Sequence, residues 1–108
     1  MGFSSIEEVR NHIDQIDSEL VKLIAQRAGC VKAAAAFKTD STAVRAPDRV
    51  EQVIYKVREK AAEIGLSEVI IEKVYRSMID AFIDYELKQH EQLKQEKPDS
   101  ARHQKSKH

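Results

Sequence analysis

The feature that most constrains this chain is a stripe of mostly apolar side chains at helical spacing, which runs through its first third with no helix-breaking residue. Apolar side chains recur every three or four residues from Ile6 to Leu23, and the spacing continues to Phe37 without a proline. This spacing is typical of one face of an α-helix. Ser5 and Glu8 match a capping box, which starts such a helix. The pattern predicts a single helix of roughly 33 residues, about 50 Å long at 1.5 Å per residue.

The length of this helix indicates an oligomer. The chain has 108 residues, and a compact domain of that size has a radius of gyration of only about 13 Å. A helix of about 50 Å overshoots such a domain, so much of its apolar stripe would be bare in a monomer. We therefore expect a homodimer in which the long helices of two copies intertwine.

The remaining sequence predicts two further helices. The polar segment 39–46 is typical of a loop, Pro47 suits the first turn of a second helix, and Gly65 suits its C-terminal cap. Ser67 can cap a third helix, whose apolar spacing runs from Ile71 to Tyr85. We expect an all-α fold of three helices (long, short, long). Residues 1–95 would form the helical domain, and the polar, aperiodic residues 96–108 a disordered tail.

Charge and motif content exclude several classes of function. Lysine plus arginine and aspartate plus glutamate number 18 each, so the basic excess expected of a nucleic-acid or membrane-surface protein is missing. No apolar run suits a signal peptide or a membrane span. Cys30 is the single cysteine, which favours a reducing compartment. We expect a cytoplasmic protein with no metal site and no cofactor, because neither nucleotide-binding motifs nor spaced metal ligands occur.

Cations occupy unexpected positions on the stripe. Arg27 stands where an apolar side chain is expected, and a buried guanidinium needs either a core carboxylate or an anionic ligand. Lys38 follows eleven residues later, about three turns on and nearly on the same face, so the two could hold a small dianion. Arg10 lies about a third of a turn off that line and far along the axis. It could reach the same site only from another subunit.

Glu86 is a carboxylate on an apolar face. It shares that face with Ile79, Phe82 and Ile83, at helical spacings. A glutamate at such a place is commonly a solvated residue at the edge of the stripe. If Glu86 is buried instead, its carboxyl would be held neutral and could donate a hydrogen bond.

Three stretches carry a family resemblance. "VRNHIDQIDSELVKLIAQRAGCVKAAAAFK", "RAPDRVEQV" and "YRSMIDAFIDYELKQ" follow one another in an order and separation that resemble the small all-helical chorismate mutase family. The resemblance spans Ile6 to about Gln92. It implies an intertwined helical homodimer with two equivalent active sites, which agrees with the dimer expected from helix length.

The resemblance also implies roles for five residues. Arg10 would be donated across the dimer to one carboxylate of a dianionic substrate, and Arg27 would bind the other carboxylate from within the subunit. Lys38 would donate to the ether oxygen and a carboxylate. Arg49 matches an arginine beside the site. Glu86 falls where many relatives have glutamine and some have glutamate, as the second donor to the ether oxygen.

The implied activity has two branches. The family converts chorismate to prephenate in one pericyclic step without a cofactor. Many mutases carry carboxylates at the positions of Ala46 and Val50, whereas "APDRV" resembles the isochorismate-pyruvate lyase branch, which makes salicylate and pyruvate. That branch has glutamine at the position of Glu86. We expect a chorismate mutase, with the lyase as the alternative and a non-catalytic regulatory or scaffold dimer as a more remote one. Arg45 has no match and is expected to be solvated.

Overall fold

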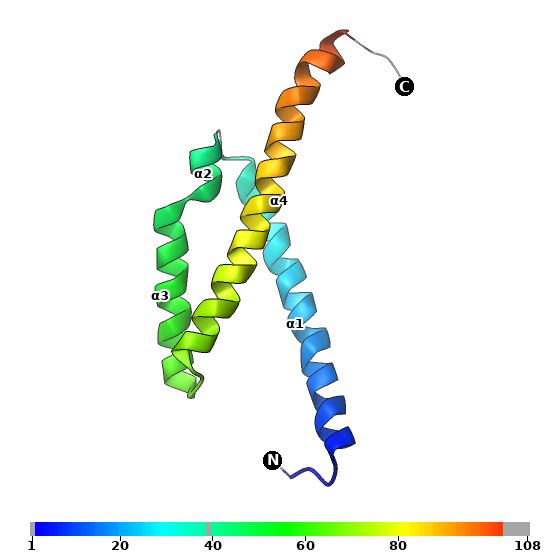
Figure 1. The fold of residues 1–108 in the computed structure, drawn as a ribbon, viewed down its shortest axis with the longest axis vertical. Coiled ribbons are helices and arrows are strands. Elements are labelled where there is room, and N and C mark those ends of the chain that lie inside the picture. The colour runs from blue at the N-terminus through cyan, green and yellow to red at the C-terminus, as the bar shows by residue number, and fades with distance from the viewer. Residues whose placement is uncertain (1, 39, 103–108) are drawn as a thin grey trace. The chain divides into compact units, whose positions relative to one another are not determined.

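The computed structural model describes residues 2–38 and 40–102. The described residues form four helices and, within those two ranges, no strand (Figure 1). This confirms the predicted all-α fold class. The chain divides into two compact units, one reaching to Phe37 and the other beginning at Lys38. Each unit is described by itself below.

The first unit is built on α1 (Ile6–Ala35), and its start confirms the predicted cap. The Glu8 N–H donates to Ser5 Oγ at 3.2 Å. The Glu8 carboxylate accepts from the Ser4 N–H at 3.0 Å, one residue earlier than a capping box would have it. Both acidic residues of the first turn face the positive end of the helix dipole.

The end of α1 corrects one prediction. The helix has 30 residues and ends at Ala35, about one turn short of the predicted length. Lys38 therefore lies beyond the helix, and the expectation that Arg27 and Lys38 share one helical face is wrong. Four alanines in a row favour helix, but they supply no side chain that could extend apolar packing past the last turn.

The second unit opens with a helix where a loop was expected. Helix α2 (Ser41–Arg45) is a single turn within the segment 39–46. Asp40 Oδ1 accepts from the Ala43 N–H at 2.9 Å, and the Val44 side chain is buried, 4% exposed. A cap and one buried side chain thus hold a turn that its sequence would not hold unaided.

Helix α3 (Pro47–Ile64) begins and ends as predicted. Pro47 occupies its first turn, and Gly65 caps it at φ 81°. Ala46 joins α2 to α3, with φ 38° and ψ 61°, and serves as the C-cap of one and the N-cap of the other. The left-handed region disfavours a residue with a Cβ by roughly 1–2 kcal/mol, so this junction is a strained position.

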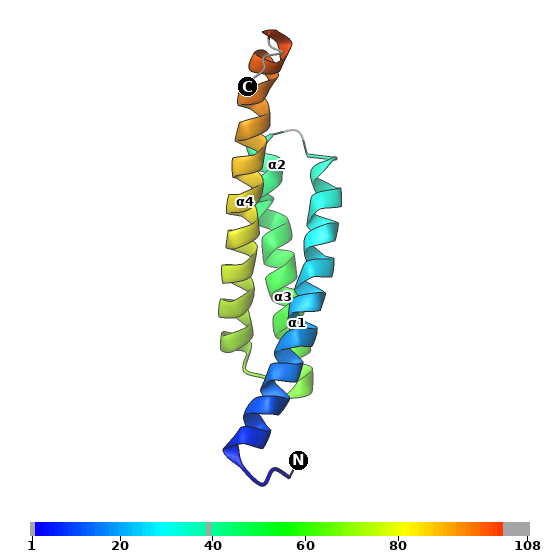
Figure 2. The same cartoon turned by 90° about the vertical axis from the view of Figure 1, so that its right-hand side faces the viewer.

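Helix α4 (Glu68–Arg102) runs back along α3 from the turn at Gly65 (Figures 1 and 2). The predicted cap is present, because Ser67 Oγ accepts from the Ile70 N–H at 3.3 Å. The apolar contact between α2, α3 and α4 is small. Its buried members are Val44, Ile54, Ala61 and Ile79.

A charged cluster supplements this small core. It comprises two residues of α3 and three of α4: Glu51, Arg58, Glu68, Glu72 and Arg76. Arg76 donates from both terminal nitrogens to Glu51 at 3.0 Å and from Nε to Glu72 at 2.7 Å. Arg58 bonds Glu72 and donates to Glu68 at 3.3 Å. The bonds from Arg76 lower the pKa of Glu51 and of Glu72, and Arg58 lowers that of Glu72 further.

The C-terminal part of α4 overlaps the predicted tail. The helix continues through residues 96–102, and residues 103–108 lie outside the described residues. No helix among the described residues is long and apolar enough to cross a membrane.

Candidate active site

The second unit brings together two residues that are far apart in sequence. Lys38 Nζ donates to Glu86 Oε2 at 3.3 Å and to Oε1 at 3.4 Å. The side chains are 22% and 13% exposed, respectively. The ammonium and the carboxylate attract each other more strongly than an exposed pair would, because less water screens their charges. The ammonium and the carboxyl thus form a half-buried polar centre.

Helix α4 sets the surroundings of Glu86. Ile79 is buried two turns before it, and Phe82 and Ile83 are half-buried one turn before it. This confirms that Glu86 lies on an apolar face rather than on a solvated edge. Its carboxylate accepts two bonds from Lys38, so a role as a donor requires that this pair rearrange when a substrate binds.

The first unit carries two of the three other predicted cations. Arg10 is exposed on the second turn of α1, and Arg27 is half-buried near its last third. They are 17 positions apart in one helix, which separates them by about 25 Å along the axis. Two residues of the same α1 therefore cannot hold the two ends of one small molecule.

Arg49 contacts a residue of its own helix. It is exposed in the first turns of α3, and its Nη1 donates to Gln52 Oε1 at 3.4 Å. Arg45 is exposed, as its lack of a family match suggested. The structure therefore joins two of the five predicted site residues directly. The roles of all five stay predictions.

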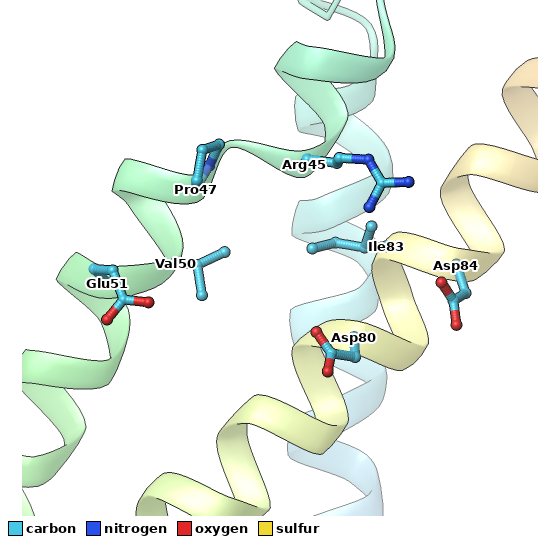
Figure 3. Close-up of a pocket in the computed structure, with 7 residues that line it drawn as sticks. All are labelled: Arg45, Pro47, Val50, Glu51, Asp80, Ile83 and Asp84. Carbon is cyan, nitrogen blue, oxygen red and sulfur yellow. The ribbon is translucent and has the colours of Figure 1, made fainter.

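A pocket of about 480 Å³ lies between the start of α3 and the middle of α4 (Figure 3). Arg45 extends from α2 toward α4, and Val50 faces the same space from α3. The lining is Arg45, Pro47, Val50, Glu51, Asp80, Ile83 and Asp84. Val50 stands at a position where the resemblance leads one to expect a carboxylate, so this wall is apolar there.

The described side chains include no group of three or more His, Cys, Asp or Glu arranged to hold a metal ion. The polar centre found here consists of an ammonium and a carboxyl. Such groups can donate hydrogen bonds to an oxygen that gains negative charge, and they can orient an anionic molecule.

Sequence reasoning missed two features of the second unit. The capping interaction of Asp40 was hidden, because a five-residue helix has too few positions to show a period. The charged cluster was partly visible, since Glu72 and Arg76 stand at i and i+4. Its bonds from α3 to α4 depend on how the two helices pack, which spacing in one helix does not reveal.

Comparison with known proteins agrees with this geometry. The chain is similar to an isochorismate pyruvate lyase of Pseudomonas aeruginosa, with 31% identity over 85 residues, which cover 79% of this chain and 84% of that protein. It is also similar to a chorismate mutase of Methanocaldococcus jannaschii, with 29% identity over 76 residues, 69% of this chain and 77% of that one. The model of the family described as chorismate mutase type II matches residues 9–87. That span contains all five predicted site residues and most of the chain, and the chain belongs to the chorismate mutase type II family.

Proposed function

We propose that this protein is a chorismate mutase, which converts chorismate to prephenate. The observation that carries the proposal is the contact between Lys38 and Glu86, at 3.3 and 3.4 Å. It places two hydrogen-bonding groups, 48 positions apart in sequence, in one half-buried centre within a chain of this family. These are the two residues that the resemblance assigns to the ether oxygen of the substrate.

The reaction requires little of the protein beyond position and charge. In one concerted step the ether C–O bond breaks, a C–C bond forms, and negative charge develops on the oxygen. The Lys38 ammonium would donate to that oxygen, and the protonated Glu86 carboxyl would donate as well. Such preorganised donors stabilise the charge where it develops. Holding the side chain over the ring supplies the remaining rate enhancement.

The two carboxylates of the substrate call for two more cations, which we assign to Arg27 of the same chain and Arg10 of a second chain. The axial separation of these residues on α1 supports this division. A homodimer is further supported by α1, all of whose residues are described and none of which is buried. Ile6, Ile16 and Leu23 on its stripe are each more than half exposed.

The test of the function is to supply chorismate and isochorismate separately and identify the products. Prephenate from chorismate, with the higher kcat/KM, is the expected result. Lys38→Ala should lower that kcat/KM by about 10²–10³, because one preorganised donor is lost, while circular dichroism remains that of the folded chain. Near-wild-type turnover in this variant would place the chemistry elsewhere.

Isochorismate-pyruvate lyase is the second candidate, favoured by Ala46 and Val50. Neither carries a carboxylate, whereas the resemblance implies that many mutases have one at these positions. In that reaction the same C–O bond breaks and one hydrogen passes from the ring to the three-carbon side chain, so the donors at the ether oxygen serve equally. Salicylate and pyruvate formed from isochorismate far more efficiently than prephenate from chorismate would assign the lyase.

A non-catalytic dimer predicts a different outcome for both substrates. Neither would be converted, and neither would raise the unfolding temperature, since only a ligand that binds the folded state stabilises it. A raised unfolding temperature without turnover would instead indicate a binding module.

A further inference from the structure

We infer that Asp40 and Val44 are positioning residues for Lys38, and that they act by holding α2 against α4. This inference deepens the proposed function and rests on it for its catalytic consequence. Their effect passes through the short helix that follows Lys38 in the chain.

Helix α2 depends on two attachments. Five residues form a single turn, which is far too short to be stable by itself in water. At its N-terminal end, Asp40 Oδ1 accepts from the Ala43 N–H at 2.9 Å. On its inner side, Val44 is 4% exposed and is the buried residue of this helix, all of which is described. The cap fixes the shape of the turn, and Val44 fixes its place.

Backbone hydrogen bonds of Ala46 fix the C-terminal end of α2. The Ala46 N–H donates to the Thr42 carbonyl at 3.0 Å, and the Ala46 carbonyl accepts from the Val50 N–H at 3.1 Å. One residue thus ends α2 and begins α3. A shift of α2 would have to break one of these bonds or move α3, which the charged cluster binds to α4.

The position of α2 in turn limits that of Lys38. Two residues separated by one other are at most about 7 Å apart between Cα atoms, so the backbone of Lys38 stays close to that of Asp40. The Nζ atom must reach both oxygens of Glu86, at 3.3 and 3.4 Å. If α2 loosened, Lys38 would sample many positions, and the donor would no longer be preorganised.

The first measurement is a double-mutant cycle on stability. Lys38→Ala is made in the wild-type chain and in the Asp40→Ala chain, and the unfolding midpoints of the four proteins are compared. We expect Lys38→Ala to lower the midpoint in the wild type but to have little further effect after Asp40→Ala. Additive shifts would overturn the inference, because independent sites add.

The second measurement is turnover, with capping variants as the internal comparison. Asp40→Ala and Val44→Ala should each lower kcat/KM at least about tenfold, the effect of a donor that is no longer preorganised. Asp40→Ser and Asp40→Asn keep a capping oxygen and should stay within about twofold of wild type. Ser67→Ala is the matched control, because it removes the side-chain cap at the N-terminus of α4 and leaves the cap of α2 intact. A loss of turnover in Ser67→Ala equal to that in Asp40→Ala would mean that general destabilisation explains both.

The two measurements separate this inference from the proposed function. The stability cycle needs no substrate, so it reports on the coupling of Asp40 to Lys38 even in a chain that converts neither chorismate nor isochorismate. A coupled cycle without turnover refutes the proposed function and keeps the positioning role. Turnover with an additive cycle refutes the positioning role and keeps the function.

Discussion

Replacing Glu86 by glutamine tests the centre of the proposed site most directly. The substitution keeps the shape of the side chain and keeps a group that can donate a hydrogen bond. It removes the charge that pairs with Lys38, whose Nζ lies 3.3 Å from the nearer carboxylate oxygen. The variant therefore changes the ability to ionise and little else.

The structure gives the scale of the effect on stability. Opposite unit charges 3.3 Å apart attract by about 5 kcal/mol at an effective dielectric constant of about 20. Desolvation and side-chain ordering offset most of that, and pairs with partial solvent access retain about 1 kcal/mol. We expect Glu86→Gln to reduce the free energy of unfolding by about 1 kcal/mol, a loss that leaves the chain folded.

The effect on activity separates two roles for Glu86. A carboxylate beside a dianionic substrate is repelled by it and cannot donate, so a donor role requires a neutral side chain in the reactive complex. The amide of Glu86→Gln is neutral and keeps a donor of similar shape. If Glu86 donates to the ether oxygen, kcat/KM of Glu86→Gln should equal or exceed that of the wild type, whereas Glu86→Ala, which loses the donor, should fall by about 10²–10³.

The assay is kcat/KM for chorismate at neutral pH for Glu86→Gln and Glu86→Ala, with Lys38→Ala measured in parallel. Lys38→Ala should be slow, because it lacks a donor whatever side chain stands at position 86. A loss in Glu86→Gln as large as that in Glu86→Ala would refute the reasoning. Glu86 would then serve only to hold Lys38 in place.

Two further predictions follow from other parts of the structure. Mixing the Arg10→Ala and Arg27→Ala proteins under subunit exchange should restore roughly a quarter of the active sites. Random exchange makes half of the dimers mixed, and each mixed dimer has one intact site. A verified heterodimer without activity would contradict the shared site. Arg76 holds the pKa of Glu51 and Glu72 below the usual carboxyl range, so the stability it contributes is present at neutral pH and is lost as pH falls through those lowered values. In the Arg76→Gln variant, the unfolding midpoint should therefore decrease less steeply as pH falls below neutral. An unchanged decrease would show that other carboxylates dominate the loss of stability in acid.

Local signals in the sequence predicted the frame of the fold well. The caps at Ser5, Gly65 and Ser67 all occur where predicted, because each depends on residues within one or two turns. The end of α1 was predicted less well. A run of alanines favours helix everywhere, so the sequence there carries no stop signal, and Ala35 is the last helical residue for reasons beyond local propensity.

Contacts between distant segments were predictable only through family resemblance. Spacing showed that Glu86 lies on an apolar face, but not that Lys38 lies beside it, because nothing local links positions 48 apart. Helix α2 was missed for the same reason. This helix depends on the burial of Val44 in the second unit. The helix propensities of its five residues do not reveal that burial.

The left-handed backbone at Ala46 has a consequence for how this protein can evolve. At φ 38° a β-branched residue is disfavoured, whereas glycine, asparagine and aspartate adopt this conformation most readily. Aspartate would also suit the start of α3, where no side chain caps the helix. The position at which many chorismate mutases carry a carboxylate is therefore one where this backbone already accepts aspartate. A lineage could gain or lose that carboxylate by a single substitution at Ala46, without first acquiring a compensating change in the fold.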